Sequence, residues 1–229
     1  MLSLKGLSML FGELEGLPRF SSERIGDFHV YLSQWKWGIP LIIVGIIVAI
    51  IYILFNKITL LIGEKLKKYR VIICVIAGLL LGVVGHFIGS GRFSGEDQMY
   101  TLIYNYTDFA VIGLIILGIV KLLMVNVSVN LGWKGGTIFP MIYAAVSVGY
   151  ACTLLINATG TLDEFEAVFA VAITAASMLG FLMRKPITVI AILLLCFPLS
   201  FLPAIIVASF VSSVFSNFIA SKLNKVQNN

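Results

Sequence analysis

The sequence contains few charged residues. Only 12% of its 229 residues are Asp, Glu, Lys or Arg, which is about half the share in an average soluble protein. In contrast, 59% are hydrophobic and the mean hydropathy is +1.03. So few charges cannot cover a water-facing surface. This composition argues against a soluble globule, a disordered chain and a nucleic-acid-binding protein, and it predicts an integral membrane protein.

Residues that build enzyme sites are also scarce. The chain has two histidines and three cysteines, no cysteine pair is spaced as CxxC, and the HExxH, GxSxG and GxxxxGK[ST] motifs are absent. Acidic side chains are confined to the ends of the chain and to loops, so no paired carboxylates are expected at membrane depth. We therefore expect no catalytic residue, no metal site and no cofactor, and the protein is predicted not to be an enzyme.

The apolar residues gather in six stretches, most of them close to the roughly 20 helical residues that a bilayer requires. These stretches are 38–56, 71–91, 109–131, 138–159, 167–183 and 186–221. The last is too long for one crossing and contains Pro198 and Pro203, so it is predicted to form two helices that meet near residues 197–203. The predicted fold class is an all-α polytopic membrane protein with about seven membrane-spanning or broken helices.

Basic residues between the stretches predict the orientation in the membrane. The segment 57–70, expected to be a loop, holds five basic residues against Glu64, whereas the connections at 92–108 and 163–166 are mainly acidic. Lys and Arg are retained on the cytoplasmic side of membrane proteins. We therefore expect a chain in the plasma membrane with its N-terminus outside and its C-terminus in the cytoplasm.

Composition also divides the chain into segments. Residues 1–36, with four basic and four acidic side chains, are expected to be an extramembrane linker and the remnant of a preceding helix. Residues 37–221 are expected to form the transmembrane helical domain, and residues 222–229 a polar tail. A glycine-rich break at 89–95 is expected to be an external loop, with a re-entrant turn as the alternative, and 97–106 a short helix near the interface.

The most informative segment is a second glycine-rich break, NLGWKGGTIFP at 130–140, which opens an apolar helix with Pro in its first turn. Irregular backbone survives in a bilayer only where protein or a water-filled cavity satisfies its polar groups. The first N–H groups of a helix have no intrahelical partner and carry the positive end of its dipole. The backbone amides of Gly135, Gly136, Thr137 and Ile138 are therefore candidate anion ligands. A plain loop between two spans is the alternative.

Lys121 lies in the middle of the third apolar stretch. A charge at that depth is costly and usually faces the protein interior or a cavity, so Lys121 is a candidate interior or pore charge. The alternative is a lysine that snorkels toward an interface. His86, near a span end, is expected to be a hydrogen-bonded interfacial residue rather than a proton relay.

The order of these features resembles the C-terminal half of the CLC family of chloride channels and chloride/proton antiporters. The segment 136–140 is similar to the family's GxFxP anion-site motif at the start of its helix N, although Ile138 stands at the Phe position and Phe139 follows it. The sequence RKPIT at 184–188 is similar to the RxPLT junction between helices O and P. Residues 89–93 occupy the place of a Gly-rich turn before helix K, and Lys121 matches a basic residue common in helix L or M.

The resemblance covers roughly residues 33–217 and implies the family's architecture, a homodimer with one pore per subunit built from two inverted halves. It implies that the amides of Thr137 and Ile138 contact an anion, with Gly135 and Gly136 permitting its approach. It also implies chloride as the transported ion, by passive conduction or by proton exchange. The first-half motifs GSGIP and G[KR]EGP do not occur in this sequence, and we expect the final helix with the family's pore tyrosine to be missing as well.

The missing motifs leave the implied function incomplete. We expect a truncated gene product that transports little alone, with a fragment and one partner of a split transporter as alternatives. The expected partners are the lipid bilayer and either a second copy or a first-half chain, and no nucleic acid. Two other functions stay open, a non-transporting membrane subunit and a permease for another substrate.

Overall fold

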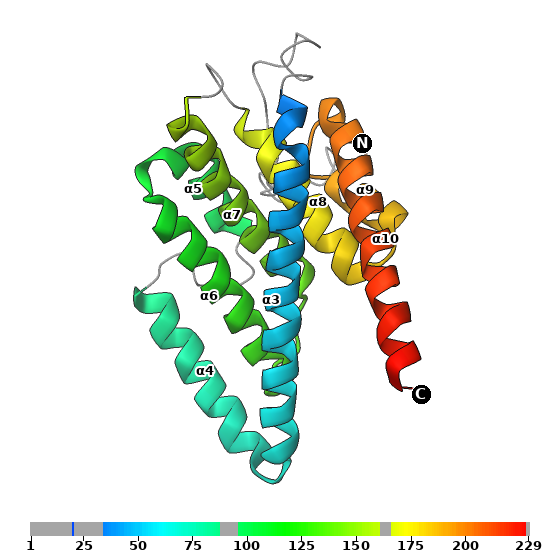
Figure 1. Cartoon of the computed structure of the whole chain (residues 1–229). Helices are drawn as coiled ribbons and strands as arrows, with labels where there is room; N and C mark the ends of the chain where they lie inside the picture. The colour runs from blue at the N-terminus through cyan, green and yellow to red at the C-terminus, as the bar shows by residue number, and fades with distance from the viewer. Residues whose placement is uncertain (1–19, 21–33, 88–95, 161–165, 228–229) are drawn as a thin grey trace, which may run out of the picture.

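The computed structural model describes residue 20 and residues 34–87, 96–160 and 166–227. Within these residues the regular structure is entirely helical, which confirms the predicted all-α class. The α-helices are α3 (Gly38–Lys65), α4 (Arg70–Phe87), α5 (Glu96–Asn105), α6 (Val111–Asn130), α7 (Ile138–Ala158), α8 (Ala167–Met183), α9 (Pro186–Leu193) and α10 (Leu202–Gln227) (Figure 1). The predicted break at 89–95 and most of the predicted N-terminal linker lie outside the described residues.

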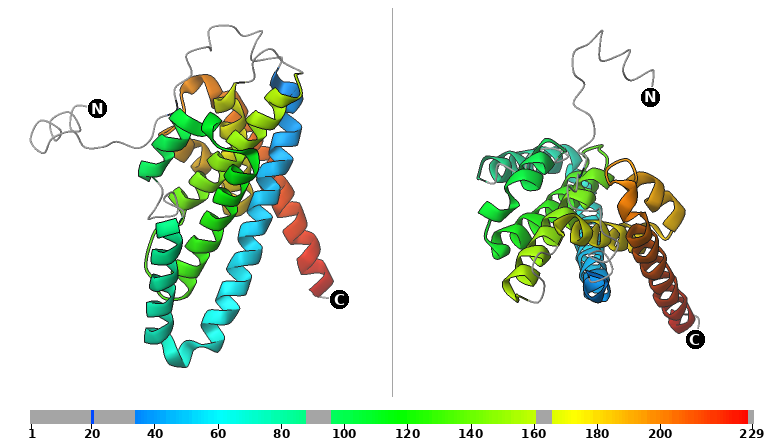
Figure 2. Two further views of the ribbon diagram at one scale, coloured as in Figure 1. Left: turned by 90° about the vertical axis from the view of Figure 1, so that its left-hand side faces the viewer. Right: turned by 90° about the horizontal axis from the view of Figure 1, so that it is seen from above.

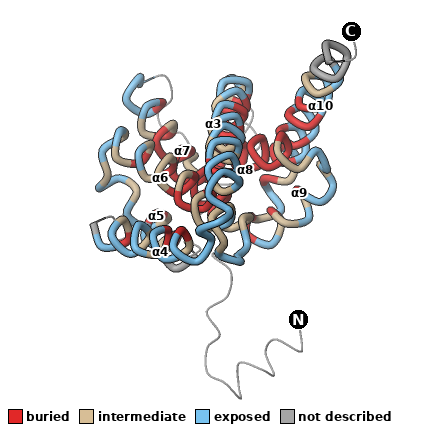
Figure 3. Tube along the Cα trace, turned by 90° about the horizontal axis from the view of Figure 1, so that it is seen from below, coloured by how far each residue is buried: buried red, intermediate tan, exposed pale blue. Residues whose placement is uncertain are grey.

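Helix α8 forms the buried centre of the bundle. In the described residues, α3, α4, α6, α7 and α10 are long and apolar enough to cross a membrane, whereas α8 has only 17 residues. Nearly every residue of α8 is buried, because α3, α7 and α10 all pack against it. Figure 3 shows this buried core surrounded by exposed outer faces.

The outer faces are apolar. On α3 and α4 large aliphatic side chains stay exposed, among them Ile39 at 71% and Val71 at 78%. Contiguous apolar surface of this kind is rare on water-soluble monomers but is the normal boundary with lipid. The protein is therefore an integral membrane protein whose helices contact the bilayer.

Glycines let the central helices approach one another closely. A Cβ on Gly45 of α3 would meet the Ser177 hydroxyl and the Thr174 carbonyl oxygen of α8. A Cβ on Gly180 of α8 would lie 2.7 Å from the carbonyl oxygen of Ser209 on α10. Lipid provides no hydrophobic drive between helices, so this close contact between small residues holds the bundle together.

The last apolar stretch divides where its prolines predicted. Pro198 lies between α9 and α10, and Pro203 is in the first turn of α10. Phe20 is buried at this junction, where it stacks on Phe197 with 4.4 Å between ring centroids and donates its backbone N–H to the Cys196 carbonyl at 2.9 Å. Helix α10 continues through Gln227, into the segment predicted as a polar tail.

The basic segment at 57–70 is mostly helix, contrary to the loop expected for it. Helix α3 continues through Lys65, with Lys57 on its exposed side, and only residues 66–69 separate α3 from α4. With 28 residues, α3 is about 42 Å long, more than the thickness of a bilayer's hydrocarbon core. The views in Figures 1 and 2 agree that the α3–α4 hairpin reaches past the ends of the other helices.

Candidate anion-binding site

The connection between α6 and α7 begins with a tight turn. The N–H of Leu131 donates to the Val127 carbonyl at 3.1 Å, and the N–H of Trp133 donates to the Ser128 carbonyl at 2.9 Å. Gly132, between them, has a φ of +119°, which side chains rarely allow. The turn ends α6 and directs residues 133–136 along an irregular path to the start of α7 at Ile138, where the sequence predicted a helix to begin.

The first amides of α7 receive no partner from their own helix. The first intrahelical bond runs from the N–H of Met141 to the carbonyl of Thr137 at 3.1 Å. The helix therefore supplies no carbonyl to the N–H groups of Ile138 and Phe139, and Pro140 has none. Donors at the positive end of a helix dipole suit an anion.

A cavity of about 810 Å³ lies beside this helix start, with walls from α4, α6 and the 133–136 connection. Gly135 and Gly136 line the cavity, and a Cβ on either residue would meet no other atom within 4 Å. The space above their backbone is therefore open to a ligand. Thr137 and Ile138 follow directly in the chain but are not among the residues that line the cavity.

Lys121 lines the same cavity from α6, although only 2% of its surface is exposed. Its ammonium Nζ lies 4.9 Å from the ring centroid of Tyr143 on α7. The described lining residues include Lys134 and His86 but no Asp or Glu. Lys121 is thus almost completely buried in the cavity wall, and the positively charged side chains around the cavity favour a negatively charged ligand.

Helix α3 fixes both ends of the connection. Near its α6 end, the Asn130 side-chain amide donates to Asn56 Oδ1 at 2.8 Å and to Thr59 Oγ1 at 2.7 Å. Near its α7 end, a side-chain hydrogen bond joins Tyr52 and Thr137. These bonds attach both ends of the connection to α3.

Sequence reasoning missed that α4 forms one wall of the cavity. The indole N–H of Trp133 donates to the Cys74 carbonyl at 3.0 Å, and a Cβ on Gly78 would lie 2.8 Å from the Trp133 ring. Gly78, Gly82 and Gly85 line the cavity from α4. Their spacing places them on one face of a helix, which is a signal that the sequence already contained.

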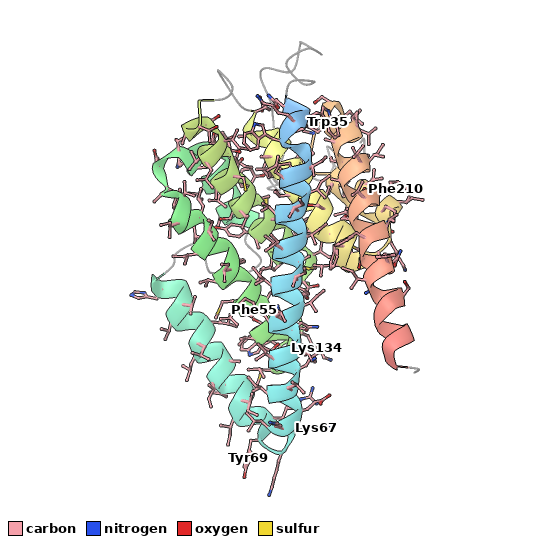
Figure 4. The ribbon with its side chains drawn as sticks, in the orientation of Figure 1. Trp35, Phe55, Lys67, Tyr69, Lys134 and Phe210 are labelled. Carbon is pink, nitrogen blue, oxygen red and sulfur yellow. The ribbon has the colours of Figure 1, made fainter. Side chains whose placement is uncertain are left out.

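Lys134, which lines the cavity, and the hairpin lie toward the same end of the protein. Figure 4 shows Lys134 in the half of the bundle that also holds Lys67 and Tyr69, while Trp35 is at the opposite end.

In the part of the chain that the structure describes, no group of three or more His, Cys, Asp or Glu side chains could hold a metal ion.

A family model described as voltage gated chloride channel matches residues 10–217 of the chain. The chain belongs to the CLC family. Membership confirms the resemblance drawn from the sequence, and it identifies a protein of the ion-channel and transporter class rather than an enzyme.

Two curated relatives illustrate how far this similarity to individual proteins extends. A putative ion-transport protein YfeO from Escherichia coli O1:K1 / APEC is 32% identical over 83 residues, which cover 36% of this chain and 20% of the relative. YfeO from Escherichia coli strain K12 / DH10B is 31% identical over the same length, with the same coverage. The match spans about one fifth of the length of these relatives. No solved structure matches the chain.

Proposed function

We propose that this CLC-family chain contributes an anion-binding half to a transporter that moves chloride, by passive conduction or by exchange with protons. One observation carries the proposal. The backbone of Gly135 and Gly136, beside the start of α7, and the buried side chain of Lys121 line the same cavity. The family's description as a chloride channel supports chloride as the ion.

Two kinds of positive charge act on the ion. The amides at the start of α7 contribute partial charges and directed hydrogen bonds, and Lys121 contributes a full charge from an almost fully buried position. The Lys121 ammonium Nζ also lies 4.9 Å from the centroid of the Tyr143 ring, a cation–π contact that holds the charge beside the start of α7. A cavity of about 810 Å³ is much larger than one chloride ion, so the ion can enter with part of its hydration shell.

The same proposal assigns a partner. Transporters built from inverted repeats place their site between two halves, and the first-half motifs GSGIP and G[KR]EGP do not occur in this sequence. A first-half chain, or a second copy in a homodimer, would complete the site. The basic residues at 65–70 support a plasma-membrane orientation with this hairpin in the cytoplasm, the N-terminus outside and the C-terminus inside.

Substitution of Lys121 by Met tests this function. Met keeps the length of the side chain and removes its charge, so chloride binding, followed by the line width of the chloride-35 NMR signal, is expected to weaken roughly tenfold. The free energy of unfolding is expected not to fall, because a buried charge is itself costly. Lys185→Met, at an exposed position, is the matched control and should bind chloride like the wild type. If Lys121→Met bound chloride normally and lost stability, Lys121 would be a structural residue and the proposed function would lose its main support.

A further inference from the structure

A dense group of basic residues lies at the turn between α3 and α4. Lys65, Lys67, Lys68 and Arg70 fall within six residues, and Glu64 is the single acidic residue beside them. Every residue from 64 to 72 is exposed. We call residues 64–70 the basic tip.

Apolar side chains continue to the basic tip from both sides. On α3, Leu61 is 50% exposed and Ile62 is 41% exposed, and on α4 the exposed fractions of Val71 and Ile72 are 78% and 59%. Outward-facing aliphatic side chains of this size belong in hydrocarbon. The membrane surface therefore lies just beyond them, and the basic tip lies at the level of the lipid headgroups.

Tyr69 supports the same depth. The residue is 53% exposed, and the Lys68 ammonium lies 6.0 Å from the centroid of its ring. Tyrosine is enriched at the boundary between the hydrocarbon and the headgroups, where its ring is in lipid and its hydroxyl is hydrated. Figures 1 and 2 show the tip at the far end of the hairpin, beyond the ends of the other helices.

Other basic residues differ from this group. Arg184, at the end of α8, donates from Nε to the Ser216 hydroxyl at 3.0 Å and so joins α8 to α10. Lys36 and Lys185 are exposed, but each has at most one basic neighbour in sequence. The tip is the place in the described chain where exposed basic residues, exposed aliphatic residues and a tyrosine occur together.

We propose that the basic tip binds the headgroups of anionic phospholipids. The lysine ammoniums donate to phosphate oxygens, and the planar guanidinium of Arg70 can donate two parallel hydrogen bonds to one phosphate. Clusters of basic residues directly cytoplasmic to a membrane helix attract the anionic lipids of that leaflet. Binding would fix the depth of the α3–α4 hairpin in the bilayer. This inference does not depend on anion transport.

The test uses the full chain in detergent micelles with equal amounts of phosphatidylglycerol and phosphatidylcholine that carry the same acyl chains. Native mass spectrometry counts each lipid bound. The wild type is expected to retain more phosphatidylglycerol, and Lys67→Gln/Lys68→Gln is expected to lower the ratio of the two lipids on the order of tenfold. The matched control, Lys36→Gln/Lys185→Gln, removes the same charge elsewhere and is expected to keep the wild-type ratio.

Three results would overturn the proposal. An equal loss in both double variants would assign the preference to net charge, and an unchanged ratio in Lys67→Gln/Lys68→Gln would show that the tip does not bind the headgroup. Displacement of phosphatidylglycerol by excess inorganic phosphate would make the tip a general phosphate site. Circular dichroism with thermal melting verifies that the two double variants fold, which is expected because the changed positions in each are exposed.

Discussion

Thr137 would contribute to the proposed anion site in two ways that can be separated by substitution. Its side chain forms a hydrogen bond with Tyr52 of α3, which fixes the start of α7. Thr137 is also the N-cap residue of α7, so its backbone N–H lies at the N-terminal end of this helix, where the dipole is positive. One substitution removes the side-chain bond and another removes the N–H, so the two contributions can be measured independently.

Thr137→Pro is expected to weaken chloride binding several-fold, because it deletes one amide donor from the proposed ligand set. Calorimetric titration with chloride measures the change. Thr137→Ala is the control, since it loses the hydroxyl but keeps the N–H and should bind more tightly than the proline variant. Equal affinity in the proline variant and the wild type would remove this amide from the site.

At the scale of whole elements, the close packing of α8 against its neighbours depends on glycines, which have no side chain. A Cβ on Gly180 would meet the Ser212 hydroxyl and the backbone of Ser209, while a Cβ on Gly82 of α4 would meet nothing within 4 Å. Glycine is therefore required at position 180 of α8, whereas position 82 of α4 has room for a side chain.

Gly180→Leu is expected to separate α8 from α10 and to lower the free energy of unfolding by about 1–3 kcal/mol or more. Gly82→Ala should leave it unchanged or raise it slightly, because alanine favours a helix. Unfolding in mixed micelles, followed by circular dichroism, compares the two variants. Similar stability in both would contradict the close contact between α8 and α10.

The helices differ in how well the sequence predicted them. The start of α7 and the break between α9 and α10 were predicted because glycine and proline act locally on the backbone. The continuation of α3 through Lys65 was missed because the charged residues were interpreted as a loop, although Lys and Glu favour helices and charge does not end one. The glycine spacing on α4 was a signal in the sequence, but it does not say what that face packs against, since the Trp133–Cys74 bond that fixes the wall joins residues 59 positions apart.

At the scale of the molecule, the basic hairpin and Trp35 lie at opposite ends of the bundle. Lys67 lies at the hairpin end and Trp35 at the opposite end (Figure 4). Lys36 is next to Trp35 in the sequence and is exposed, so it provides a reporter for that end.

A cysteine at Lys67, in a background without the three native cysteines, is expected to react with a membrane-impermeant maleimide only from the cytoplasm. A cysteine at Lys36 is expected to react only from outside. Labelling of intact and opened cells distinguishes the two sides. The reverse pattern would invert the orientation inferred from the basic residues.

The proposed function requires that an anion binds in the cavity between Lys121 and the start of α7. The most direct measurement is anomalous diffraction from crystals of the chain grown in bromide, an anion that replaces chloride and whose position can be located without ambiguity. We expect a bromide peak in the cavity, within hydrogen-bonding distance of the Lys121 ammonium or the amides of residues 136–138, and no such peak in Lys121→Met. A wild-type cavity without bromide, in crystals that bind bromide elsewhere, would contradict the proposed function.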